Sequence, residues 1–569
     1  MNLVIKRNIT PRLLGAFVCL LLLFGCKKDK APFENVLLLG TDFMEVSSAA
    51  GSHTFELLTN VDYSLSSDAD WLSFEAEAGT KGKQKIAFKV TKNEEEERTA
   101  VIKVSINAEQ EREIMVVQEA GSINVFYVKK DAKGTGRSWA DAIGLQAALD
   151  LSTSGSELHI AAGTYSPEKA LTGAGTADEA DRTFEISKNI KLVGGYPADA
   201  AVGAVANPAA HPTILSGKLP SGLEVFHVMA ITAPKAADQQ VEIQGITIRD
   251  GNGTDRSTKI LVGGVGYSRG NGAGMIIGGA KVILTDVSII ENKTSTRQGT
   301  GGYASGLFAF GGTELYMYNS HIDNNTGIGN GGGLWIDASN AYLYDSSFDN
   351  NKTVGTAGAI HAYPASNLYM YNCTVRGNQG TSYGAGVYLR EKSTGYIVNC
   401  IISNNKTTST NGGGGLMLYD NCEAHVISST IVSNEATGPG AGIFRRQNTN
   451  KLSIINSIVS GNKQAATSTD VDAYEAGAVA AQMSSSAIAT RIYNAGGSVQ
   501  SGVTFNAATM LNTAFVPTGA SNPALKYGMS GAALSSLGLQ YKPALDELIA
   551  KDFNRKDRGE KTTMGALID

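Results

Sequence analysis

The residues best suited to chemistry recur once per repeat in the second half of the chain. Each directly follows an apolar residue near the start of a short strand-like run. The six are Phe308, Trp335, His361, Tyr388, Met417 and Phe444. Because successive side chains of a strand point to opposite faces, burial of the apolar residue turns each of the six outward, into one column. Two positions further along, a second outward column holds Phe310, Asp337, Tyr363, Arg390, Tyr419 and Arg446.

The two columns together predict a strip that binds a polysaccharide lying along the axis of the repeat. Aromatic rings stack on sugar faces, and guanidinium groups hydrogen-bond hydroxyls or carboxylates. The candidate ligand-binding residues are Phe308, Trp335, His361, Tyr363, Tyr388, Arg390, Tyr419, Phe444 and Arg446. An aromatic strip is costly to leave in water, so two alternatives stay open. A long loop folds over the strip, or the stacked rings only stabilise the sheet.

The same columns offer weaker candidates for catalysis. His361, Tyr388 and Arg390 would lie close together, with Asp337 two repeats from Arg390. A lyase needs a base beside a charge neutraliser, and a glycoside hydrolase needs two carboxylates that flank the bond. No second carboxylate joins Asp337, and no cluster of Asp and Glu suggests calcium. The sequence therefore predicts no metal and no other cofactor.

These positions are held in phase by an internal repeat of about 27 residues. In each repeat a Gly cluster precedes an apolar strand, and an apolar residue is followed three positions later by Asn. The Asn residues are Asn292, Asn325, Asn351, Asn378, Asn405, Asn434 and Asn462. Short strands, frequent Gly and the absence of a helical period predict one coil of a β-solenoid per repeat, stacked at about 4.8 Å. The Asn residues would then form an internal ladder of amide hydrogen bonds from coil to coil.

Further columns follow from the same stacking. Six positions before the ladder residues stand Asp286, Asn319, Asp345, Asn372, Asn399, Ser428 and Asn456, which we expect to form turns. Next to them, Cys373 and Cys400 would stack as core neighbours, where small buried thiols are favoured over a disulfide. On another sheet, structural ladders of rings are predicted for Tyr316, Tyr342, Tyr369 and Tyr396, with Tyr318, Tyr344 and Tyr371.

The N-terminus reads as an export signal. Basic residues precede an apolar run over 13–24, which is shorter than the roughly 20 residues that span a bilayer. The run ends in Leu23-Phe24-Gly25-Cys26 and resembles the lipobox of bacterial lipoproteins. This resemblance implies a signal peptide over 1–25, lipid on Cys26, a tether over 26–35 and an outer-membrane protein at the cell surface. Contact with the membrane would then be made through the anchor alone. The alternative is an ordinary signal peptide in which Cys26 has no role.

Composition sets wide limits on function. The 569 residues include 66 Gly, 13 Pro and 5 Cys, and the formal net charge is -5. A net charge of this sign and size indicates no basic surface that would bind phosphates, so we do not expect nucleic acid as a partner. The scarcity of Pro and the lack of a strict Gly-X-Y period exclude collagen, and the few Cys exclude a disulfide framework.

Residues 36–119 alternate apolar and polar side chains in short runs, which predicts a small antiparallel β-sandwich. Five runs within this segment resemble the BACON family: Ser47-Ser48-Ala49-Ala50-Gly51, Thr59-Asn60, Asp70-Trp71-Leu72, Arg98-Thr99-Ala100 and Val117-Gln118. The resemblance implies an immunoglobulin-like module of a surface lipoprotein from a glycan-utilisation system. Such a module would either bind carbohydrate or hold the working domain away from the membrane.

The repeats also resemble known families. Gly331-Gly332-Gly333-Leu334 and Ala357-Gly358-Ala359-Ile360, each followed by the apolar-x-x-Asn pattern, are similar to polymorphic outer-membrane protein repeats and to the pectate-lyase-like superfamily. These resemblances imply a right-handed parallel β-helix over 120–465. Ahead of the coils, Ser138 and Asp141 predict a capping box for a short helix that covers the first coil.

The end of the chain resembles the region called choice-of-anchor Q. The similar segments are Ser521-Asn522-Pro523-Ala524 and Asp552-Phe553-Asn554. The resemblance implies that 466–569 close the C-terminal end of the β-helix.

The sequence thus predicts an all-β protein, a small antiparallel β-sandwich followed by a right-handed parallel β-helix solenoid. We expect a surface lipoprotein that uses one face of the helix to bind a polysaccharide, such as a host or environmental glycan, or to act as an adhesin. A polysaccharide lyase or glycoside hydrolase is the alternative, and a purely structural surface stalk is the third reading.

Overall fold

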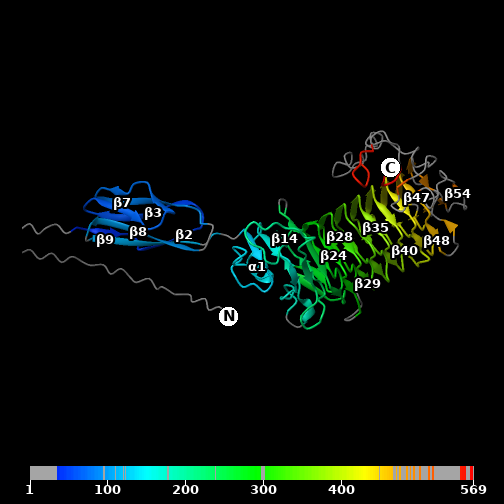
Figure 1. The fold of residues 1–569 in the computed structure, drawn as a ribbon, viewed down its shortest axis with the longest axis horizontal. Helices are drawn as coiled ribbons and strands as arrows, with labels where there is room; N and C mark the ends of the chain where they lie inside the picture. The colour runs from blue at the N-terminus through cyan, green and yellow to red at the C-terminus, as the bar shows by residue number, and fades with distance from the viewer. Residues whose placement is uncertain are drawn as a thin grey trace, which may run out of the picture. The chain divides into compact units, whose positions relative to one another are not determined.

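The computed structural model describes residues 35–465 apart from 94–96, 109, 120, 122–123, 176–177, 237–238, 297–301 and 448, together with parts of 469–517, 551–558 and 564–567. The export signal, Cys26 and nearly all of the tether lie outside the described residues. The chain divides into two compact units, Met1–Ser122 and Ile123–Asp569, both built almost entirely of strands (Figure 1). Within the described residues, no helix is long and apolar enough to cross a membrane.

The N-terminal unit is a β-sandwich of two sheets. One sheet consists, in order, of β1 (Leu37–Leu39), β3 (Gly51–Thr59), β7 (Gly82–Val90) and β5 (Leu72–Phe74). The other consists of β2 (Phe43–Val46), β9 (Gln110–Gln118), β8 (Arg98–Asn107), β4 (Tyr63–Ser67) and β6 (Ala78–Gly79). Alternate residues such as Phe88 and Ile102 are buried between the sheets. Trp71 packs against this core, and the Arg98 guanidinium lies 4.6 Å from the centre of its ring.

The second unit is a parallel β-solenoid, which confirms the predicted fold class. Its first long sheet, which we name the site sheet, runs through β13 (Phe184–Ile186), β16 (Met229–Ile231), β22 (Met275–Gly278), β26 (Leu307–Phe310), β30 (Leu334–Asp337), β33 (Ile360–Ala362), β37 (Val387–Arg390), β41 (Leu416–Tyr419), β45 (Ile443–Arg445), β50 (Ala473–Glu475), β53 (Arg491–Tyr493) and β54 (Val499–Gln500). Its neighbours are parallel up to the last pair, which is antiparallel.

The second long sheet, which we name the tyrosine sheet, is also twelve-stranded. It runs through β10 (Val125–Val128), β11 (Glu157–Ala161), β14 (Lys191–Tyr196), β17 (Val241–Gln244), β23 (Lys281–Thr285), β27 (Glu314–Tyr318), β31 (Asn340–Tyr344), β34 (Asn367–Tyr371), β38 (Thr394–Val398), β42 (Glu423–Ile427), β46 (Lys451–Ile455) and β51 (Gln482–Ser484).

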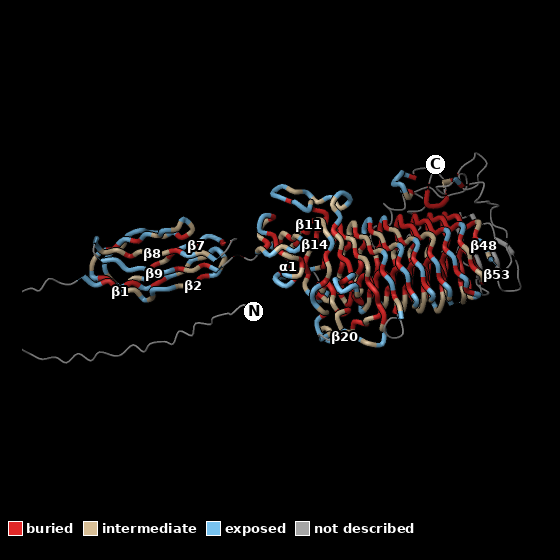
Figure 2. The backbone as a smooth tube through the Cα atoms, turned by 60° about the horizontal axis from the view of Figure 1, so that its bottom comes forward, coloured by how far each residue is buried: buried red, intermediate tan, exposed pale blue. Residues whose placement is uncertain are grey.

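The remaining sides are built from shorter strands. The flank sheet has two five-stranded parts, from β12 (Gly163–Tyr165) to β28 (His321–Asp323) and from β35 (Thr374–Arg376) to β52 (Ala487–Ile488). A nine-stranded sheet of very short strands begins at β19 (Asn252–Gly253) and ends at β49 (Thr469–Asp470). One apolar core runs through the coils, and the inward stretches of each coil are buried (Figure 2).

The Asn residues form the predicted internal ladder. All seven are buried, and each Asn from Asn292 to Asn434 accepts or donates hydrogen bonds with its neighbour one coil away. Asn378 is typical: its amide donates to the carbonyl of Phe348 (2.7 Å), and its Oδ1 accepts from the backbone N–H of Asn351 (2.8 Å). The ladder therefore satisfies buried backbone N–H groups of the ladder residues and buried carbonyls of neighbouring coils.

The second predicted column forms turns. Asp286, Asn319, Asp345, Asn372, Asn399, Ser428 and Asn456 all have φ between 45° and 53°. This left-handed conformation favours Asn and Asp over bulkier residues, which explains their recurrence. Beside the turns, Cys373 and Cys400 are buried free thiols, as predicted.

The start of the helix at the N-terminal end of the solenoid differs from the prediction. The single described α-helix, α1 (Leu145–Leu151), begins four residues after Asp141 and has Gly144 as its N-cap, with no side-chain cap. Half of the predicted capping box is present, because Oγ of Ser138 accepts from the backbone N–H of Asp141 (3.2 Å). The carboxylate of Asp141 accepts from the backbone N–H of Thr135 (3.0 Å), and the prediction that this motif begins the helix is wrong.

The C-terminal segments pack on the side of the coils. Arg558 donates to Oδ1 of Asn399 (3.1 Å), and Arg555 pairs with Asp345. Ala566 and Leu567 bury Ile401 of the flank sheet. The C-terminal end of the chain is red in Figure 1. The described parts of 551–567 thus cover a flank of coils that precede them by more than 100 residues.

Candidate functional site

The first outward column is not exposed. Trp335 is 5% exposed and His361 1%, and the column as a whole is buried: Phe308, Trp335, His361, Tyr388, Met417 and Phe444. The alternation itself holds, because Leu334 and Ile360 face the core. Backbone register places the six residues opposite one another on successive strands of the site sheet. The prediction that this column forms an exposed strip is therefore wrong.

Segments from outside the sheet cover the column. Tyr303, from the turn before β26, stacks on Trp335 with ring centres 4.6 Å apart, and Tyr383 lies parallel to Tyr388 at 6.1 Å. A hairpin of β20 (Lys259–Val262) and β21 (Val265–Ser268) adds Ile260 and Tyr267 to the cluster around Phe308 (Figure 2). The covering loop was one of the two alternatives left open by the sequence.

Burial also bears on the catalytic candidate His361. Its ring lies between Trp335 (4.2 Å) and Tyr388 (4.8 Å), and neither ring nitrogen has a hydrogen-bond partner among the described residues. Burial, with a smaller contribution from the charge of Arg390, lowers the pKa of His361 to about 3. His361 is therefore neutral and enclosed near pH 7, which does not suit a general base that must meet a substrate.

The second outward column lies at the surface. Its members are partly exposed: Phe310, Asp337, Tyr363, Arg390, Tyr419 and Arg446. We name these six the row. The Arg390 guanidinium carbon lies 5.0 Å from the ring centre of Tyr363 and 5.9 Å from that of Tyr419. Arg446 lies 4.5 Å from the ring centre of Tyr419 and 5.1 Å from that of Tyr383. The cations and rings hold one another in place through cation–π contacts.

The charges of the row are only partly neutralised. Nη2 of Arg390 lies 3.2 Å from Oε1 of Glu391, and its Nε lies 4.0 Å from Oδ2 of Asp420. Arg446 makes no ion pair with a described carboxylate, and its Nη1 has no hydrogen-bond partner there. At the other end, burial raises the pKa of Asp337, which Lys259 partly offsets. The row therefore presents two partly exposed guanidinium groups, of Arg390 and Arg446, which can bind an anion beside the exposed parts of Tyr363 and Tyr419.

The rings of the tyrosine sheet are ladders, as predicted. Tyr316, Tyr342, Tyr369, Tyr396 and His425 stack face to face, with centres 4.6, 4.8, 5.5 and 4.6 Å apart. Because neighbouring rings occupy these faces, the stack offers edges and no open platform for a sugar. Its role is to stabilise the pairing of the coils.

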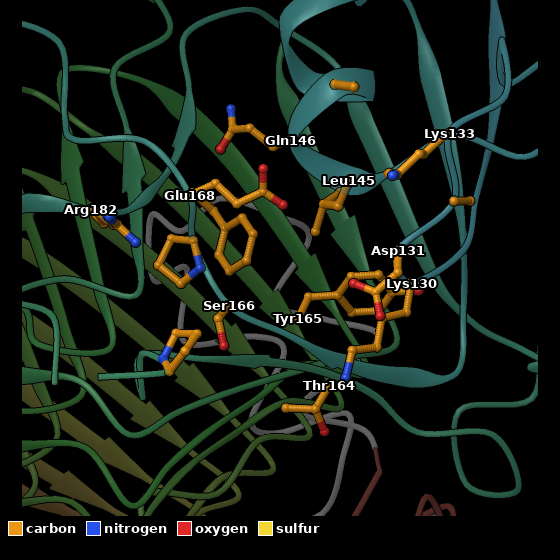
Figure 3. A pocket seen from close by; sticks show the side chains of 16 residues that line it. Lys130, Asp131, Lys133, Leu145, Gln146, Thr164, Tyr165, Ser166, Glu168 and Arg182 are labelled. Atoms are coloured by element: carbon orange, nitrogen blue, oxygen red, sulfur yellow. The ribbon is translucent and has the colours of Figure 1, made fainter. Parts of the chain in front are cut away.

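A cavity of about 620 Å³ lies at the N-terminal end of the solenoid, between the start of α1 and the turn after β12 (Figure 3). It is lined by charges of both signs, including Lys130, Lys133, Asp131 and Glu168, and by the buried ring of Tyr165. Its volume is in the range of small-molecule sites. The cavity can hold a small polar molecule, and it lies on other coils than the row.

Sequence reasoning missed a polar cluster where the flank sheet is interrupted. Oγ of Ser347 donates to Asp323 (2.7 Å) and lies 2.8 Å from Nδ1 of His321. Asp323 and Asp349 each accept the backbone N–H of a residue one coil further on, Asp349 (2.7 Å) and Arg376 (2.9 Å). Burial, and next the charge of Asp323, raise the pKa of Asp349 to about 6. The recurrence of Asp directly after the apolar position could have indicated this cluster. Its bonds to backbone groups identify it as part of the fold.

Comparisons with known proteins agree with the architecture. Residues 304–463 and 357–494 match the model of a right handed beta helix region, and 61–119 match BACON, an N-terminal domain with an inferred binding role. The chain therefore carries a BACON-type domain followed by a right-handed parallel β-helix. The search of curated proteins found no match.

Two solved structures are similar in part. A GH5 xyloglucanase from Bacteroides ovatus, in complex with a XXXG heptasaccharide, is 16% identical over 29% of this chain, with a TM-score of 0.15. The aligned region spans 37% of the length of that enzyme. The pectate lyase Pel9A is 13% identical over 63% of this chain and 79% of its own, with a TM-score of 0.36.

Proposed function

We propose that this chain, a BACON-type domain followed by a right-handed parallel β-helix, binds an extended acidic polysaccharide along the row. The observation that carries the proposal is the partly exposed Tyr363, Arg390, Tyr419 and Arg446, held together by ring–guanidinium distances of 4.5–5.9 Å. Stacked cations and rings on rigid strands form a preorganised surface, which reduces the entropy lost on binding. The buried column beside it on the same face supports this surface, since the rings of Trp335 and His361 lie 6.2 and 5.9 Å from that of Tyr363.

The binding proposal predicts the effect of removing two rings. Replacing Tyr363 and Tyr419 together by Ala should weaken binding of an acidic polysaccharide about tenfold, since each stacking contact contributes about 0.5–1.5 kcal/mol. Isothermal titration calorimetry with the full-length protein would measure the loss. The matched control replaces Tyr316 and Tyr342, whose faces are covered by neighbouring rings. Equal affinities for the two double variants would contradict the proposal.

A second candidate function is cleavage of the bound polysaccharide. It is favoured by Asp337, whose carboxyl has a pKa raised by burial and lies on the same row as Arg390. Analysis of products after incubation with the polysaccharide distinguishes the two functions, because unsaturated ends indicate a lyase and new reducing ends alone indicate a hydrolase.

The proposal also includes the location of the protein in the cell, which would be set by a lipid anchor on Cys26. Leu23-Phe24-Gly25-Cys26 supports lipidation of Cys26, which would hold the protein on the outer membrane with the β-helix available to glycans at the cell surface. Cys26→Ala should remove the acylation site and leave the protein unlipidated. Partition into a detergent phase measures this directly, and a variant that still partitions like the parent would refute the anchor.

A further inference from the structure

The row alternates strictly in character. Aromatic side chains occupy one coil and charged side chains the next, over six coils in the order Phe310, Asp337, Tyr363, Arg390, Tyr419 and Arg446. Strand register places Phe310 opposite Asp337 and Arg390 opposite Tyr419, and the flanking pairs extend the same register along the sheet. The alternation is not a consequence of forming the turns between strands, because these side chains lie on the outer face of the sheet.

The spacing of the pattern is comparable with that of a glycan. Neighbouring strands lie about 4.8 Å apart, so like residues of the row recur at about 9.6 Å. An equatorially linked pyranose, measured between its two glycosidic oxygens, advances an extended chain by a distance close to one strand spacing. A polysaccharide that lies along the row therefore presents one sugar per coil, and every second sugar meets a charged side chain.

We infer that the row recognises an acidic polysaccharide in which charged and uncharged sugars alternate. This inference rests on the proposed function and adds the class of ligand. Uncharged sugars would pack against the exposed parts of Tyr363 and Tyr419, and the anionic sugars between them would meet Arg390 and Arg446. Arg390 and Arg446 are both partly exposed, so their guanidinium groups can meet such anions.

Other charge patterns fit the row less well. A polymer with a carboxylate on every sugar would place every second carboxylate beside Tyr363 or Tyr419, where no cationic side chain of the row stands on the same coil to replace the water that the carboxylate loses. A neutral polymer would cover Arg446 without supplying an anion in exchange for the water it displaces. Asp337 lies two coils before Arg390, and its ionised carboxylate would repel a further anionic sugar. The part of the polysaccharide that carries anionic sugars would therefore end near Tyr363.

The test compares three polymers of similar length at physiological salt, where long-range attraction between charges is screened. They are a polymer of alternating uronic acid and N-acetylhexosamine, a polymer of uronic acid alone, and a neutral β-linked glucan. With the full-length protein, calorimetry should give a Kd for the alternating polymer about tenfold lower than for the polyuronate. Replacing Arg390 and Arg446 together by Gln should abolish this preference, whereas Lys451→Gln, on the tyrosine sheet, should leave it intact.

The outcomes separate this inference from the proposed function. If the polyuronate binds as tightly as the alternating polymer, and the Tyr363 and Tyr419 variant weakens both, the row binds polysaccharide and the inferred alternation is wrong. If the arginine variant keeps the preference, the alternation is also wrong. If none of the three polymers binds, both the inference and the proposed function fall.

Discussion

Trp335→Ala should lower the free energy of unfolding of the β-helix by about 3–5 kcal/mol, as expected when a large buried aromatic side chain is removed. Trp335 is 5% exposed and contacts Tyr303, Phe308 and His361, with ring centres 4.6, 6.0 and 4.2 Å away. Its removal would leave a cavity between the site sheet and the turn that covers it. Denaturant unfolding monitored by circular dichroism measures the loss.

The control for Trp335 is Tyr363, one coil further on and on the row. Tyr363 is partly exposed, so Tyr363→Ala should cost less than about 1 kcal/mol of stability. If the two variants unfold at the same denaturant concentration, the covering turn does not bury Trp335 in solution. The sequence-based prediction of an open aromatic strip would then be restored.

Asn378→Leu should destabilise the stack by about 2–6 kcal/mol. Leu cannot replace the bond to the carbonyl of Phe348 (2.7 Å) or the acceptor for the N–H of Asn351 (2.8 Å). Each buried polar group left without a partner costs about 1–3 kcal/mol. Because coils contact only their neighbours, the effect should concentrate around Asn351 and Asn405. Thermal melting with hydrogen exchange resolved along the chain would measure both its size and its location.

The control for Asn378 is the next residue, Gln379. Its side chain is exposed, so Gln379→Leu removes a similar amide without stranding a buried group and should change the melting temperature little. Similar losses of protection in the two variants would show that the amide ladder does not hold the coils together.

The repeat could be predicted because its Asn, Gly and apolar residues recur at a nearly fixed spacing in the sequence. The Asn ladder, the left-handed turn positions and the inward residues all follow from one periodic pattern and from the alternation of a strand. Alternation also assigned Trp335 and Tyr363 correctly to the outer face. The sequence could not show what lies over that face, because the cover comes from elsewhere in the chain. Ile260 and Tyr267 belong to a hairpin some 70 residues before Trp335, and nothing in its composition indicates where it packs.

The structure at the ends of the solenoid was difficult to predict from the sequence for a related reason. Ser138 and Asp141 fit a capping box by type and spacing, and Oγ of Ser138 accepts from the N–H of Asp141. The carboxylate of Asp141, however, accepts from Thr135, and α1 begins only at Leu145. The helix-start pattern thus competes with another contact six residues earlier in the chain. Arg558 and Ala566 likewise reach back to Asn399 and Thr430, which only the assembled coils bring near.

The central claim is that a polysaccharide lies along the row. A crystal structure of the protein with a hexasaccharide of alternating uronic acid and N-acetylhexosamine tests it most directly. The account predicts sugar density parallel to the solenoid axis, with rings on Tyr363 and Tyr419 and carboxylates at Arg390 and Arg446. Density confined to another part of the protein, such as the cavity beside α1, would contradict it.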